Sequence, residues 1–144
     1  MRILVSGGGT AGHISPILAT VDALKLLDSD VEVLYVGQKG SMESKIAKGA
    51  GIEFAAISAG KLRRFADHKL IQKLTDVRSL ALNARDLTRV VKGFSQSLRI
   101  IKNFDPDVIF LKGGYVALPV GLAARFLKVP YVIHESDMRP GLTN

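Results

Sequence analysis

The feature that most constrains the fold of this chain is a regular alternation of short apolar runs with longer, helix-like stretches. The runs are rich in Val and Ile and nearly continuous in hydrophobicity, which is typical of strands covered on both faces. This alternation predicts an α/β fold with a doubly wound, mostly parallel sheet of the Rossmann-like type. The expected strands are Arg2–Ser6, Val31–Val36, Glu53–Ile57, Asp107–Leu111 and Pro130–His134, and the expected helices are Ile14–Leu27, Met42–Ala50, about Asp67–Asn103 and Val116–Leu127.

Ligands of such sheets bind at the carboxyl ends of the strands. Three distinctive loops follow expected strands there, namely Gly7–Pro16, Lys112–Pro119 and His134–Asn144, and Gly60–Arg64 follows a fourth. We therefore expect the functional site among these loops. His134 itself stands at the end of what reads as a buried strand, and we expect it to be a satisfied core histidine.

The charge of the chain is concentrated in one segment. The net charge is +7, and the segment from Lys61 to Lys92 alone holds nine basic and three acidic residues. Such clustering indicates an anionic partner, which could be a membrane surface, a phosphate or a nucleic acid, or it is a solvated helical face. Nucleic acid is the weakest of these because only Phe65 and Phe94 offer aromatic stacking there. The absence of cysteine excludes disulfides and thiol chemistry.

The opening loop contains the spacing G-x-G-x-x-G over Gly7 to Gly12, directly after an apolar run. Glycines before a helix make a good anion cradle, since backbone N–H groups and the helix dipole both favour negative charge. A dinucleotide site also needs an acid at the end of the second strand. Glu32 lies near the wrong end of that strand and Glu43 lies beyond its loop. The sequence therefore disfavours NAD and NADP, and we expect no cofactor.

Four motifs together resemble one known family. They are Gly7–Pro16, Gly60–Arg64, Lys112–Ala124 and Val129–Asn144, and they occur in order from one end of the chain to the other. This pattern is similar to the N-terminal, acceptor-binding half of the MurG family, the lipid-linked N-acetylglucosaminyltransferases of peptidoglycan synthesis. Ala11 stands where that family usually has glycine, and Asp137 stands where many members have asparagine.

The resemblance implies the N-terminal half of a metal-independent GT-B glycosyltransferase, with residues 1–144 as a single acceptor-binding domain and the C-terminal donor-binding domain absent from this chain. The family transfers N-acetylglucosamine from UDP-N-acetylglucosamine to lipid I, an undecaprenyl-diphosphate-linked muramoyl peptide, with inversion. The product is lipid II, made at the cytoplasmic face of the membrane by a peripheral protein. Because a GT-B site lies between two halves, we expect the 144-residue chain to be inactive alone.

His13 is the main catalytic candidate. At a helix N-terminus the dipole favours a neutral imidazole, which suits a general base, and an inverting transfer needs one. The alternative is that His13 only hydrogen-bonds a phosphate or packs locally. Glu135 is a possible support, because it could orient His13 or accept a sugar hydroxyl, but loop capping explains it equally well.

The remaining site candidates are expected to bind the acceptor. Backbone N–H groups of the two glycine loops could contact a diphosphate, with a lysine nearby as the cation. Thr10 could donate to a phosphate or cap the following turn, and Tyr115 could stack on a sugar or pack on the helix. The substrate-binding candidates are Gly9, Thr10, Ala11, Gly12, Lys112, Gly113, Gly114, Tyr115, Asp137 and Asn144.

Membrane contact is expected at Lys61, Leu62, Arg63, Arg64 and Phe65. A different class of function also fits the residues: a non-catalytic subunit that docks on a membrane and presents a lipid-linked sugar to a separate catalytic chain. The triplet Asp105-Pro106-Asp107 matches the D-x-D of metal-dependent glycosyltransferases. It precedes its strand, however, which places it at the edge opposite the site, and Asp-Pro is a common turn. We therefore predict no metal.

Overall fold

The computed structural model describes residues 1–9, 11–60 and 77–134, with the side chains of 77–84 left aside. It contains a five-stranded sheet in the order β3-β2-β1-β4-β5, and every neighbouring pair is parallel. The doubly wound α/β class expected from the sequence is confirmed. The strands are β1 (Arg2–Ser6), β2 (Glu32–Gln38), β3 (Glu53–Ile57), β4 (Val108–Leu111) and β5 (Tyr131–Ile133).

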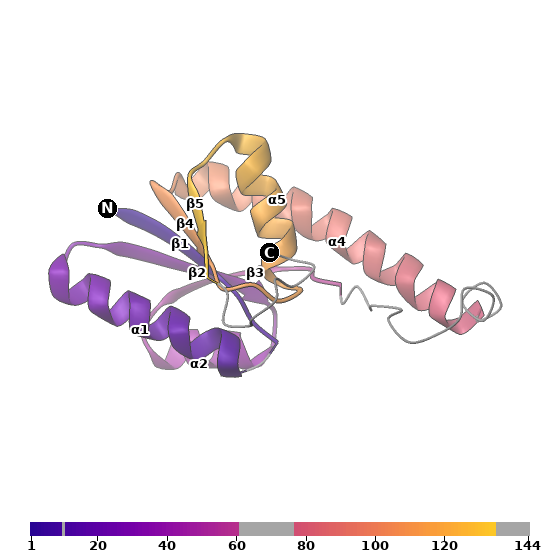
Figure 1. Ribbon diagram of the computed structural model, residues 1–144, viewed down its shortest axis with the longest axis horizontal. Coiled ribbons are helices and arrows are strands. Elements are labelled where there is room, and N and C mark those ends of the chain that lie inside the picture. The colour runs from indigo at the N-terminus through magenta and orange to yellow at the C-terminus, as the bar shows by residue number, and fades with distance from the viewer. Residues whose placement is uncertain (10, 61–76, 135–144) are drawn as a thin grey trace.

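Helices cover both faces of the sheet, as Figure 1 shows: α1 (Ala11–Leu27) and α2 (Met42–Gly49) on one face, α4 (Val77–Phe104) and α5 (Ala117–Leu127) on the other. Successive strand residues point to opposite faces. Ile3 and Val5 therefore join Ile17 of α1 in one core, whereas Leu4 joins Val120 of α5 in the other. The long α4 extends well past the sheet in Figure 1.

Helix α1 begins earlier than the sequence pattern indicated. It starts at Ala11 rather than Ile14, so that His13 lies in its first turn. The apolar pattern of the sequence begins at Ile14, but the helix takes in Ala11, Gly12 and His13 as its first residues. The helix tolerates Pro16 in its second turn, where the missing N–H leaves the Gly12 carbonyl without its i+4 donor.

Strand β2 runs past its expected end at Val36. Gly37 pairs with Ala56 and Gln38 with Ile57 in the parallel ladder with β3. Glycine usually interrupts a strand, but here the close approach of neighbouring side chains requires its lack of Cβ: a Cβ at Gly37 would lie 2.8 Å from Glu43 Cγ. The site edge of β2 is therefore formed by Gln38.

The expectation of a buried last strand and a core histidine is wrong. All three residues of β5 are exposed, and so is His134. The reason is topological: among the residues that the structure describes, β5 is the last strand in the sheet order and its one neighbour is β4. The His134 N–H donates to Leu111 O at 2.8 Å, and its ring lies 6.2 Å from that of Phe110.

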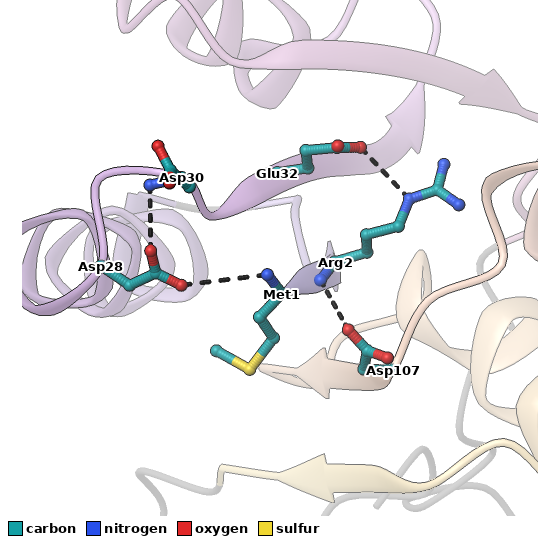
Figure 2. A network of polar contacts seen from close by, with 6 residues as sticks. All are labelled: Met1, Arg2, Asp28, Asp30, Glu32 and Asp107. Carbon is teal, nitrogen blue, oxygen red and sulfur yellow. Dashed lines mark hydrogen bonds and ion pairs between the residues drawn. The ribbon is translucent and has the colours of Figure 1, made fainter.

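The amino edge of the sheet carries a network of exposed charges, drawn in Figure 2. Arg2 Nε lies 3.2 Å from Glu32 Oε2, and the Arg2 N–H donates to Asp107 Oδ2 at 2.7 Å. The guanidinium of Arg2 also lies 4.7 Å from the ring centroid of Phe104. The network confirms that Asp107 and Glu32 belong to the edge opposite the expected site.

Candidate active site

The two glycine loops meet at the carboxyl edge of β1 and β4. The Lys112 N–H donates to Ser6 O at 2.9 Å, which brings the start of the β4 loop beside the end of β1. A Cβ at Gly114 would lie 2.8 Å from Gly8 O and 3.8 Å from both His13 Cδ2 and Cε1. The structure thus brings His13, Gly8 and Gly114 together, although 101 positions separate His13 from Gly114.

The N-terminus of α1 opens toward this meeting point. The first N–H groups of a helix have no partner within it and carry partial positive charge. In α1 these belong to Ala11, Gly12 and His13; the first two residues are exposed and His13 is half-buried. This geometry can bind an anion beside the imidazole, as the sequence pattern predicts.

Tyr115 packs on the glycine loop. Gly9 has φ +91°, and a Cβ there would lie only 2.8 Å from Tyr115 Cε1. The Tyr115 hydroxyl donates to Gln38 Oε1 at 3.0 Å, which links the β4 loop to the end of β2. A dinucleotide site has an acid at the end of the second strand. In this chain the end of β2 carries Gln38, whose side-chain oxygen accepts from Tyr115.

Two charged side chains are buried under the loops. Lys112 is 2% exposed and Glu43 is 1% exposed. The lysine charge therefore lies inside the fold rather than on the surface of the loop. The sequence argument uses Glu43 only to test for a ribose-binding acid and does not predict its burial. The local signal is that Glu43 stands in the first turn of α2, where the helix dipole favours an acid, directly after the N-cap region of Ser41.

Glu43 lies between the glycine loop and two tyrosines. A Cβ at Gly8 would lie 2.7 Å from the Glu43 carboxyl carbon, and Glu43 Oε1 accepts from the Gln38 N–H at 3.3 Å. Burial raises the pKa of the Tyr35 hydroxyl, and the Glu43 charge raises it further. The same two causes, in the same order, raise the pKa of Tyr115. Both tyrosines therefore remain hydrogen-bond donors at neutral pH.

Several expected site residues lie outside the residues that the structure describes. They are Thr10, Glu135, Asp137 and Asn144, together with the membrane-contact set Lys61, Leu62, Arg63, Arg64 and Phe65. Within the described ranges, no group of three His, Cys, Asp or Glu residues could hold a metal ion. Asp105 and Asp107 stand at the amino edge, away from both glycine loops.

Comparisons with known proteins decide the family. The sequence profile described as the glycosyltransferase family 28 N-terminal domain matches residues 3–144. The chain belongs to this family. The resemblance drawn from the four sequence motifs is thereby confirmed, and so is the fold class, the N-terminal half of a GT-B glycosyltransferase.

Sequence relatives of this glycosyltransferase family 28 domain share one printed name. Proteins of Lachnoclostridium phytofermentans and Clostridium botulinum are 43% and 45% identical over 143 residues, 99% of this chain. Both are named UDP-N-acetylglucosamine–N-acetylmuramyl-(pentapeptide) pyrophosphoryl-undecaprenol N-acetylglucosamine transferase. The chain spans 36% of the length of each, which is about a third.

Solved structures agree with this placement. MurG of Acinetobacter baumannii superposes with a TM-score of 0.70 at 26% identity, covering 99% of this chain and 36% of that one. The spinosyn rhamnosyltransferase SpnG, complexed with spinosyn aglycone, gives 0.63 at 24% identity, covering 98% and 36%. The second likeness shows the shared fold alone.

Proposed function

We propose that this chain is the acceptor half of an inverting glycosyltransferase that moves N-acetylglucosamine from UDP-N-acetylglucosamine to lipid I, forming lipid II. The observation that carries the proposal is the meeting of a helix N-terminus, a histidine and two glycine loops at one sheet edge, in a chain of this family. The acceptor diphosphate would bind at the helix N-terminus that begins with the exposed residues Ala11 and Gly12.

In the proposed reaction, the 4-hydroxyl oxygen of the muramoyl sugar attacks the anomeric carbon of N-acetylglucosamine. The new C–O bond forms while the bond from that carbon to the UDP oxygen breaks, and UDP leaves with the electron pair. His13 takes the proton of the attacking hydroxyl. Most donor contacts would come from the C-terminal half of the protein, which this chain does not include.

The test joins this chain to its donor half and measures lipid II formation from lipid I and labelled UDP-N-acetylglucosamine. We expect turnover by the joined protein and none by residues 1–144 alone, because one half cannot position both substrates. Turnover by the isolated chain would contradict the division into halves. No turnover by the joined protein, with lipid I still bound, would favour the alternative of a presenting subunit.

Membrane contact is the second part of the proposal. A groove of about 610 Å³ between α4 and α5 is lined mostly by apolar side chains, with Arg125 as the cation, and Val91 and Phe126 are 59% and 69% exposed. Three of the lining residues, Leu87, Val90 and Val91, belong in sequence to the basic segment Lys61–Lys92. Exposed apolar surface on a segment of that composition fits an anionic lipid surface. No helix within the described residues is long and apolar enough to cross a membrane.

Vesicle binding tests this part. The protein should bind vesicles containing anionic lipid reversibly and release them as salt rises, because each basic residue contributes about 1 kcal/mol within a Debye length of the surface. Val91→Ser with Phe126→Ser should weaken that binding, whereas Leu26→Ser on α1 of the opposite face is the matched control. Equal binding to neutral and anionic vesicles would contradict the proposal.

A further inference from the structure

Glu43 is a buried carboxylate for which the proposed reaction has no use. It lies in the first turn of α2, which helps to stabilise its charge through the helix dipole. Its one hydrogen bond within the described residues is the 3.3 Å contact from the Gln38 N–H. Burying a carboxylate is costly unless its surroundings compensate. The helix end explains how the charge is tolerated, but not why it stands against the glycine loop.

The carboxylate fills the space beside Gly8. A Cβ at Gly8 would lie 2.7 Å from both Cδ and Oε1 of Glu43, and a Cβ at Gly37 would lie 2.8 Å from its Cγ. Gly8 is not one of the spaced glycines of G-x-G-x-x-G, which are Gly7, Gly9 and Gly12. Its missing side chain lets the Glu43 carboxylate approach the loop. Glu43 therefore sets the distance between the loop after β1 and the end of β2.

Two hydrogen bonds beside Glu43 complete the connection. The Tyr35 hydroxyl donates to Gly7 O at 2.7 Å, and the Tyr115 hydroxyl donates to Gln38 Oε1 at 3.0 Å. Together they tie β2 to the glycine loop and to the loop after β4. Burial first and the nearby Glu43 charge second raise the pKa of both phenols above their ordinary value of 10.0.

We propose that Glu43 is a positioning residue, which holds the Gly7–Gly9 loop and Tyr115 in the arrangement that binds the diphosphate of the acceptor. The identity of that ligand rests on the proposed function. The role needs the volume of the side chain and an oxygen that accepts from Gln38. Glu43→Gln keeps both, whereas Glu43→Ala removes both and leaves space beside Gly8.

The kinetic test uses the protein joined to its donor half. Glu43→Ala should raise the acceptor KM by about tenfold or more while kcat and the donor KM change less than about threefold, and Glu43→Gln should restore most of the loss. If Glu43 only stabilised the fold, Glu43→Ala would lower thermal stability without raising the acceptor KM more than it changes kcat and the donor KM. Glu32→Ala, at the amino edge, is the matched control and should leave the acceptor KM unchanged.

Binding of inorganic pyrophosphate, followed by titration, separates this inference from the proposed function. If the wild type binds pyrophosphate but makes no lipid II, the proposed function fails; Glu43→Ala weakening that binding still supports the positioning role. If Glu43→Ala folds and keeps both its pyrophosphate affinity and its acceptor KM within about threefold of the wild type, the positioning role is overturned.

A double-mutant cycle and a further variant test the contact between Glu43 and the loop. Gly8→Ala should weaken pyrophosphate binding much less in the Glu43→Ala background than in the wild type, because the obstructing carboxylate is gone; additive losses would overturn the contact. If Glu43→Ala folds poorly, Glu43→Asp is the alternative, because it keeps the carboxylate but shortens the side chain and withdraws it from Gly8. It should weaken pyrophosphate binding while Glu43→Gln keeps it, and binding by Glu43→Asp within about threefold of the wild type would overturn the inference.

Discussion

The two edges of the sheet hold charge in opposite ways. At the amino edge, the side chains of Arg2 and Glu32 pair in solvent, 39% and 65% exposed (Figure 2). At the carboxyl edge, Glu43 and Lys112 are almost fully buried, and glycines allow Glu43 and Tyr115 to touch the backbone. The amino edge can be altered at little cost, whereas the carboxyl edge depends on a precise fit of its parts.

The largest expected difference between the edges is catalytic. In the joined protein, His13→Ala should lower kcat by about 100-fold or more, because general-base catalysis is typically worth 10²–10⁴ in rate. His13→Gln should not rescue it, since an amide cannot take the proton. The measurement is single-turnover kinetics, in which chemistry limits the rate.

Asp107→Asn is the matched change at the amino edge and should leave kcat within about twofold. If either His13 variant keeps more than about a tenth of kcat, the base is another group, and Glu135 or Asp137 becomes the next candidate.

Two glycines with positive φ show how much the contact with Tyr115 adds to the free energy of unfolding. Gly9 and Gly40 both have positive φ, +91° and +70°, but a Cβ at Gly40 meets nothing within 4 Å. Gly40→Ala should therefore cost only the conformational strain, about 1 kcal/mol. Gly9→Ala should cost about 1–3 kcal/mol more, because the methyl group meets the Tyr115 ring. Urea unfolding measures both, and equal losses would show that Tyr115 does not confine the loop.

Alkaline pH should expose the buried tyrosine of the carboxyl edge. The pKa of Tyr35 in the folded protein is raised above its ordinary value of 10.0 by burial and then by Glu43. This contribution to stability is fully present below pH 10 and is lost as the pH rises further, by up to about 1.4 kcal/mol per pH unit.

Tyr35→Phe should flatten that decline and, at pH 7, cost about 1 kcal/mol through the lost hydrogen bond to Gly7 O. Tyr131→Phe, on the exposed strand β5, is the control and should leave the alkaline slope unchanged. A slope identical in the wild type and Tyr35→Phe would contradict the assignment.

The smallest effect is expected at the amino edge. Glu32→Gln breaks the ion pair with Arg2, but both side chains are largely in water, so the free energy of unfolding should fall by well under about 1 kcal/mol. The loss should shrink further in high salt, since exposed pairs are screened. A loss above about 2 kcal/mol would mean that the exposed charges of Figure 2 contribute as much to the free energy of unfolding as buried charges do.

Local sequence was enough to determine the order of the elements and the sheet edge at which the two glycine loops lie. β1 and β3 have the expected bounds because Val- and Ile-rich runs between helices permit few alternatives. The two glycine loops were found because backbone contact with an anion needs glycine at fixed spacing before a helix. The position of Asp107 at the far edge followed from its place before its strand.

Only the tertiary structure decided which side chains fill the space behind those loops. Glu43 reaches Gly8, and Tyr115 reaches Gln38, through a sheet order that places β1 between β2 and β4. The exposure of β5 also depends on that order. The apolar run of β5 resembles that of a central strand, so its sequence does not show that it lies at the edge of the sheet. The periodicity of apolar residues in a segment indicates whether that segment forms a strand or a helix. Contacts between distant segments depend on how the whole chain packs, and no short stretch of sequence contains that information.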